Sequence, residues 1–88
     1  MSFIDVLIDV RSPEEYAAGH LRGALNIPVH ELTARLAGLD CRRARLAVYC
    51  RSGRRSAIAA ALLRGHGYER VTDLGGLEQA RVATDCNH

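Results

Sequence analysis

Short apolar runs alternate with amphipathic stretches along the whole chain. The run at 6–10 is short and rich in β-branched residues, which is typical of a buried strand. The runs at 24–27 and 46–49, and a weaker one near 70–73, have the same character. The pattern therefore predicts four strands.

The segment after the first predicted strand carries several helix-start signals. Ser12 is a good N-cap residue, Pro13 suits the first turn, and Glu15 completes a capping box with Ser12. Glu14 and Glu15 also place negative charge at the positive end of the helix. We expect a short helix here that ends at Gly19.

Later stretches predict further helices. Apolar residues near helical spacing indicate a helix from about His30 to Ala37, ended by Gly38. The alanine-rich stretch 56–64 is the strongest helix signal, and a final helical turn is expected after the glycine pair at 75–76. On the strongest helix we expect the apolar face at Ile58, Leu62 and Leu63.

This alternation of strands and helices predicts an α/β fold. We expect a small, mostly parallel sheet of about four strands, flanked by helices on both faces, in one domain over residues 1–88. In such sheets ligands bind beyond the carboxyl ends of the strands. The third predicted strand ends directly before Cys50, which places this residue at that edge.

Charge and composition exclude several classes of protein. The 88 residues include twelve basic residues, all arginine, and ten acidic ones, for a net charge of +2, which is too small to suggest a nucleic-acid-binding protein. No stretch approaches the roughly 20 apolar residues of a membrane span, and the first residues do not resemble a signal peptide. We therefore expect a cytoplasmic protein without nucleic-acid or membrane partners. A periplasmic mature form, its signal peptide removed, is the alternative.

A glycine- and arginine-rich loop at 50–55 separates the third strand from the strongest helix. Such a unit directs loop N–H groups and the positive helix end at one point, and Gly53 suits the tight turn. The helix end alone, at about 0.3–2 kcal/mol, lowers the pKa of a thiol there by roughly one unit. A free cysteine can also be a mere buried residue, but the glycine and arginines favour a nucleophile. We interpret Cys50 as a thiolate beside an anion receptor that includes Arg51, Arg54 and Arg55.

The spacing of this loop argues against a cysteine-dependent phosphatase. That class requires an arginine six positions after the cysteine. Here Ser56 stands at that position and Arg55 comes one residue earlier. A loop that is one residue shorter forms a smaller ring of donors, which surrounds a phosphoryl group less well.

The other cysteines and the histidines indicate no metal site. The four histidines share no ligand spacing and the cysteines form no C-x-x-C pair, so we expect neither a metal nor a cofactor. His20 is expected to make a structural hydrogen bond. Cys41 and Cys86 are ordinary surface or buried thiols in the simplest interpretation. A disulfide in an exported protein, or a resolving role for Cys86, are the alternatives.

Three motifs, in order and over roughly residues 6–80, carry a family resemblance. They are the loop C-R-S-G-R-R-S at 50–56, the signature D-V-R-S-P-E-E-Y-A-A-G-H-L-R-G-A-L-N-I-P at 9–28, and the run G-Y-x-x-V-x-x-L-G-G at 67–76. With them the sequence resembles the single-domain rhodanese-like sulfurtransferases, and in its brevity the small phage-shock-protein-E type, which is periplasmic. The resemblance implies a rhodanese-like fold.

The resemblance also implies a persulfide cycle on Cys50. The Cys50 thiolate would take sulfur from thiosulfate, and a thiol, cyanide or a protein would accept it. By position, the amides from Arg51 to Ser56, with Ser52 and Gly53 between them, would cradle the persulfide. Arg51, Arg54 and Arg55 would attract the anionic donor, and Asp9 and Arg11 match a supporting D-x-R pair. A sulfur-relay module loaded by a persulfidated partner protein, and a non-catalytic binding domain, remain alternatives.

Overall fold

A four-stranded parallel sheet forms the centre of the molecule. The computed structural model describes residues 4–36 and 42–85. The strands are β1 (Val6–Asp9), β2 (Leu25–Asn26), β3 (Arg45–Cys50) and β4 (Arg70–Gly76). They lie in the order β2-β1-β3-β4, with every pairing parallel. This confirms the predicted α/β fold.

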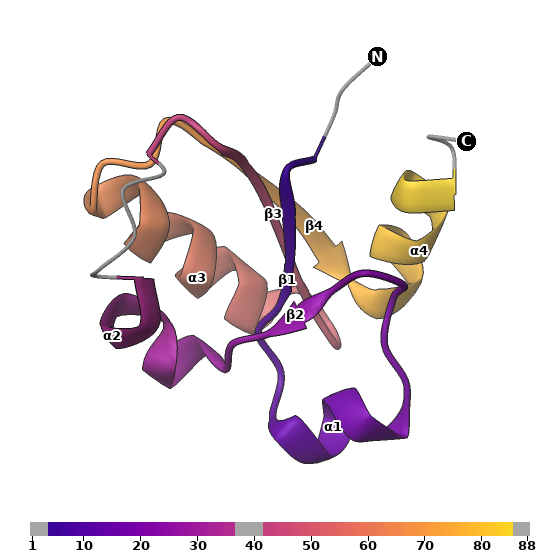
Figure 1. The fold of residues 1–88 in the computed structure, drawn as a ribbon. Helices are drawn as coiled ribbons and strands as arrows, with labels where there is room; N and C mark the ends of the chain where they lie inside the picture. Colours follow the sequence, from indigo (N-terminus) through magenta and orange to yellow (C-terminus); the bar gives the residue numbers. More distant parts are fainter. Residues whose placement is uncertain (1–3, 37–41, 86–88) are drawn as a thin grey trace.

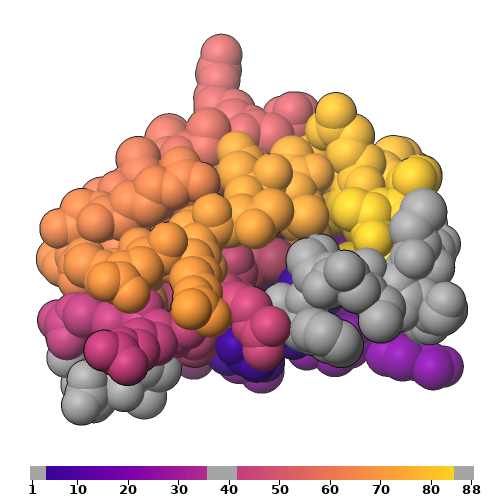
Figure 2. All heavy atoms as spheres, turned by 90° about the horizontal axis from the view of Figure 1, so that it is seen from above, coloured from indigo at the N-terminus to yellow at the C-terminus, as the bar shows by residue number. Residues whose placement is uncertain are grey.

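Helices cover both faces of the sheet (Figure 1). They are α1 (Pro13–Ala18), the 3₁₀ turn η1 (Val29–Glu31), α2 (Leu32–Leu36), α3 (Arg54–Gly65) and α4 (Leu77–Asp85). The helices α2 and α3 pack on one face and α4 on the other (Figure 1). In the space-filling view β4 appears as an orange band at the surface beside the yellow α4 (Figure 2).

The central strand β3 divides the core into two layers. Leu46, Val48 and Cys50 join the cluster that packs against α3, whereas Tyr49 joins the cluster that includes Ala80 of α4. Both faces of β3 are therefore buried, which explains its continuous apolar sequence. The parallel arrangement brings the carboxyl ends of β1, β3 and β4 to one edge, beside α1 and the first turn of α3 (Figure 1).

The first predicted helix is confirmed in detail. The Ser12 hydroxyl accepts the Glu15 N–H at 3.2 Å, and the Glu15 carboxylate accepts the Ser12 N–H at 3.1 Å. Pro13 occupies the first turn and Gly19 caps the carboxyl end. These signals were readable from the sequence because a capping box involves only neighbouring residues.

Several other boundaries differ from the prediction. The second strand has only two residues, and the C-terminal helix has nine residues, where a single turn was expected. The stretch from His30 begins as η1 and continues as α2, and its predicted end near Gly38 lies outside the described residues, as do Cys41 and Cys86.

The predicted apolar face of α3 does not coincide with the face that is buried, since Ile58 is 51% exposed. The buried positions of the helix are Ser56, Ala59, Ala60 and Leu63. The face with the two alanines packs on the sheet, so Ile58 points outward from the helix. Among the described helices none is long and apolar enough to cross a bilayer.

Candidate active site

Cys50 is the last residue of β3 and is fully buried. It lies on the central strand of the sheet, where Gly76 of β4 is its neighbour in the register. Its Sγ accepts a hydrogen bond of 2.9 Å from the backbone N–H of Gly53. The thiol therefore faces backbone donors at the carboxyl edge of the sheet, as the sequence predicted.

The chain turns from Cys50 into α3 within three residues. The structure places Arg54 and Arg55 in the first turn of the helix, so only residues 51–53 form the connection. Gly53 is the N-cap, with a left-handed φ of 99°, and it supplies no capping side chain. The sulfur of Cys50 therefore occupies the place beside the helix N-terminus that a capping oxygen otherwise takes.

Two opposing effects act on the pKa of the Cys50 thiol. Burial raises it, because a thiolate loses its hydration in the core. Hydrogen bonds from the Ser56 hydroxyl and from the backbone N–H groups of Ser56, Gly53 and Ser52 lower it. The hydrogen bonds outweigh burial, so the pKa of Cys50 is lowered and the reactive thiolate is favoured.

Ser56 occupies the position at which a phosphatase loop has its arginine. Its side chain is fully buried, and its hydroxyl lies 3.0 Å from the Gly53 carbonyl and 3.4 Å from the Gly75 carbonyl. Both oxygens can accept its single proton, and a Cys50 thiolate competes for it. Ser56 thus serves the thiol itself rather than a phosphoryl oxygen.

The glycine pair at the end of β4 closes the other side of the connection. A Cβ on Gly76 would stand 2.7 Å from the Arg51 carbonyl oxygen, so only glycine fits there. Gly76 also forms a bridge with Ser52. The sequence showed this pair only as part of a motif, because its closeness to the Cys50 loop depends on β3 and β4 being neighbours.

The three arginines of the predicted anion receptor differ in their surroundings. Arg51 and Arg54 are exposed and make no hydrogen bond or ion pair with any described residue through their guanidinium groups. Arg55 instead binds Glu15 of α1 through two hydrogen bonds of 2.7 and 3.0 Å. This ion pair lowers the pKa of Glu15 to about 2, with the hydrogen bond from Arg55 as the main cause.

The D-x-R pair forms a buried network behind Cys50. Arg11 donates to both carboxylate oxygens of Asp9 at 2.7–3.0 Å and to the Gly19 carbonyl at 2.6 Å. The Tyr49 hydroxyl donates to Asp9 at 2.8 Å and accepts the Leu21 N–H at 3.1 Å. Burial raises the pKa of Tyr49 to about 12, so the hydroxyl keeps the proton that it donates.

Two residues of this region were missed by the sequence reasoning. Tyr49 precedes Cys50 directly, yet nothing local connects it to Asp9, forty positions away. Asn26 donates to the carbonyls of Asp9 and Arg11, each at 3.0 Å, and so holds the chain as it leaves β1. His20, in contrast, makes the predicted structural contact, with its Nδ1 2.9 Å from the Tyr16 carbonyl.

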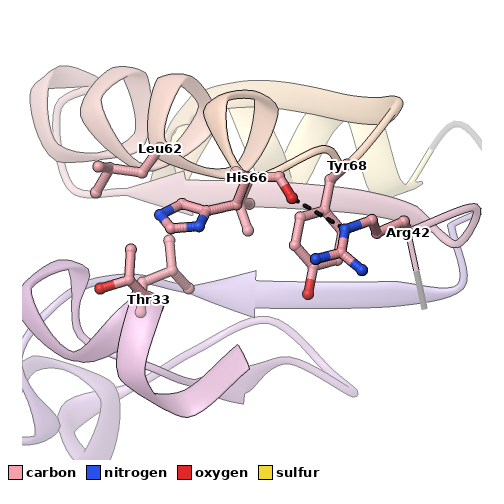
Figure 3. A pocket seen from close by; sticks show the side chains of 7 residues that line it. Thr33, Arg42, Leu62, His66 and Tyr68 are labelled. Atoms are coloured by element: carbon pink, nitrogen blue, oxygen red, sulfur yellow. Dashed lines mark hydrogen bonds between the residues drawn. The ribbon is translucent and has the colours of Figure 1, made fainter. Parts of the chain in front are cut away.

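A hollow lies at the end of α3 that is far from Cys50 (Figure 3). His66, Tyr68, Thr33 and Arg42 line it, and the Arg42 Nε donates to the His66 carbonyl at 3.0 Å. None of the described residues that line it has a thiol or a carboxylate. Within the described residues no three His, Cys, Asp or Glu side chains gather as a metal site.

The site defines an α/β domain with a buried, hydrogen-bonded cysteine at the carboxyl edge of a parallel sheet, beside a helix N-terminus. A family model described as "Rhodanese-like domain" matches residues 2–81. The chain therefore belongs to the rhodanese-like domain family, as the sequence predicted.

Individual relatives agree with this assignment. Thiosulfate sulfurtransferase PspE of Escherichia coli (strain K12) is 42% identical over 72 residues, which cover 81% of this chain and 69% of PspE. Thiosulfate sulfurtransferase GlpE of Pseudomonas entomophila is 37% identical over 71 residues, or 81% of this chain and 64% of GlpE. The chain thus spans about two thirds of the length of these relatives.

A solved structure described as a rhodanese with anions from E. coli superimposes with a TM-score of 0.78. It is 39% identical, and the match covers 84% of this chain and 88% of that one. Together the relatives support the prediction of an enzyme, a rhodanese-type sulfurtransferase.

Removing the Tyr49 hydroxyl tests the buried network. Tyr49→Phe leaves the Leu21 N–H without a partner in the core, so we expect a loss of about 1–3 kcal/mol in the free energy of unfolding, measured in urea. Tyr16→Phe is the matched control, because its hydroxyl bonds the Ala24 carbonyl in a half-buried place that water reaches. Equal losses in the two variants would contradict the network.

Replacing Ser56 tests the source of the lowered thiol pKa. Ser56→Ala removes a hydroxyl donor that favours the thiolate, so the pKa of Cys50 rises. Because the thiolate is the reactive form, the pH midpoint of iodoacetamide alkylation at Cys50 moves to higher pH. Ser52→Ala is the control, since Ser52 acts through its backbone N–H, which alanine keeps. An unchanged midpoint in Ser56→Ala disproves the assignment.

Proposed function

We propose that the chain moves sulfane sulfur from thiosulfate, or a similar small anionic donor, to a thiophilic acceptor through a persulfide on Cys50. The observation that carries the proposal is the Cys50 sulfur, buried and hydrogen-bonded to the Gly53 N–H at 2.9 Å, with a lowered pKa. The thiolate is the nucleophilic form of cysteine, and the lowered pKa favours it.

In the first step the Cys50 thiolate attacks the outer sulfur of thiosulfate. A new S–S bond forms at Cys50 while the S–S bond of thiosulfate breaks, and sulfite leaves with the electron pair. The negative charge of the persulfide then takes the place of the thiolate charge. The N–H groups of Gly53, Ser52 and Ser56 that face the sulfur are positioned to stabilise both anions.

In the second step a thiol or cyanide attacks the outer sulfur of the persulfide. The acceptor forms a bond to that sulfur, the persulfide bond breaks, and the Cys50 thiolate is restored. No cofactor or metal takes part in this balance. The cycle needs an acceptor that reaches Cys50 from the side of the exposed Arg51 and Arg54.

The surrounding residues have distinct proposed roles. The amides from Arg51 to Ser56 cradle the persulfide, and the exposed guanidiniums of Arg51 and Arg54 attract the donor. Asp9 and Arg11 support the site from below by holding β1, the end of α1 and Tyr49 together. The donor, the acceptor and the cytoplasmic compartment stay predictions.

A sulfur-relay role is the second candidate. Arg51 and Arg54 are exposed, and the exposed Ile58 lies one turn further along α3, so this surface is the one that a partner protein carrying a persulfide would contact. The non-catalytic binding domain is disfavoured, because such a domain has no need of a thiol with a lowered pKa.

Sulfur loading of Cys50 tests the proposal. After incubation with thiosulfate, we expect the intact mass to increase by one sulfur atom, and cyanide to remove it as thiocyanate. Cys50→Ser, similar in size but without a thiol, is expected to gain none. Equal loading of the two proteins, or of neither, refutes the thiosulfate activity. Loading by a persulfidated protein with none by thiosulfate would favour the relay.

A further inference from the structure

The charged groups around Cys50 occur largely in pairs that cancel. Asp9 and Arg11 form a buried pair at 2.7 Å, and Glu15 and Arg55 form a half-buried pair at 2.7 Å. Arg51 and Arg54 form no ion pair with any residue in the described ranges, and their guanidiniums lie in solvent, where their attraction for anions is screened. The electrostatic potential at the sulfur therefore depends on whether the charges of Glu15 and Arg55 cancel.

Glu15 is positioned to control that balance. Arg55 lies in the first turn of α3, which follows Cys50 after only three connecting residues. The hydrogen bond to Glu15 is the main cause that raises the pKa of Arg55, and the charge of the Cys50 thiolate adds to it. Glu15 binds both terminal nitrogens of Arg55 while its Oε1 also accepts from Ser12. The capping box of α1 thus fixes the carboxylate, and the carboxylate occupies the face of Arg55 that an anion would otherwise take.

We propose that Glu15 is a specificity-determining residue, which neutralises Arg55 and so limits how strongly the Cys50 site holds anions. The meaning of this for sulfur transfer rests on the proposed function: a dianionic donor binds less tightly, and sulfite leaves more easily, than in a site with Arg55 free. A sequence count of three arginines overstates the positive charge at the sulfur.

Paired alkylating agents measure the proposed effect without sulfur transfer. Iodoacetate and iodoacetamide have nearly the same size, and each loses iodide to the thiolate, but only iodoacetate is anionic. The ratio of their rates at Cys50 therefore reports the local potential. Trypsin cleavage after Arg45 and Arg51 releases the peptide 46–51, so mass spectrometry reads Cys50 separately from the other cysteines.

Four variants separate a charge effect from a structural one. Glu15→Gln keeps an oxygen for the Ser12 N–H but removes the charge, so the iodoacetate to iodoacetamide ratio should rise about threefold. Arg55→Gln should lower it by a similar factor, and the double variant should return it close to the wild-type value. Glu14→Gln is the control, an exposed glutamate one position away, and should leave the ratio unchanged.

The KM for thiosulfate should follow the same order, lowest in Glu15→Gln and highest in Arg55→Gln. The proposal is overturned if Glu15→Gln and Glu14→Gln give the same ratio, or if the double variant departs further from wild type than either single one, as a structural role predicts. If the ratios behave as expected but thiosulfate loads no sulfur, the proposed function fails while the charge control by Glu15 stands.

Discussion

The hydrogen bonds that Ser52, Gly53 and Ser56 donate to the Cys50 sulfur at the start of α3 are the interaction on which the site depends. β3 is paired on both sides and packed on both faces, so its last residue is removed from water. A thiolate in such a place is stable only if protein donors replace its hydration. The left-handed Gly53 and the close approach of Gly76 to Arg51 make the turn that aims those donors at the sulfur.

The buried pair behind the sulfur serves a positional purpose. Burying two charges is costly, and it is offset here because nearly every polar atom of the pair has a partner, including the Tyr49 hydroxyl and the Gly19 carbonyl. These bonds connect β1, the end of α1 and the residue before Cys50. The segment 9–28 therefore has two roles. Arg11 supports the end of β1, and Glu15 neutralises the charge of Arg55 on α3.

Features that depend on neighbouring residues were predictable. The strands, the capping box at Ser12 and Glu15, and the placement of Cys50 at a strand end before a helix all follow from local patterns. The buried face of α3 could not be predicted in this way, because its alanines are compatible with several rotations of the helix about its axis. Ile58 lies outside because the sheet, rather than the helix sequence, selects which alanines are covered.

The sequence by itself determined the fold class and the family, and it placed the candidate nucleophile Cys50 at a strand end, since apolar periodicity, capping residues and a cysteine-led glycine loop all lie in consecutive positions. Only the tertiary structure decided the charge of the site. Arg55 meets Glu15, and Tyr49 meets Asp9, each across forty positions of the chain. Such contacts exist only after β1 and β3 pair in one particular register, and ion pairing depends on a few ångströms of separation that no local pattern specifies.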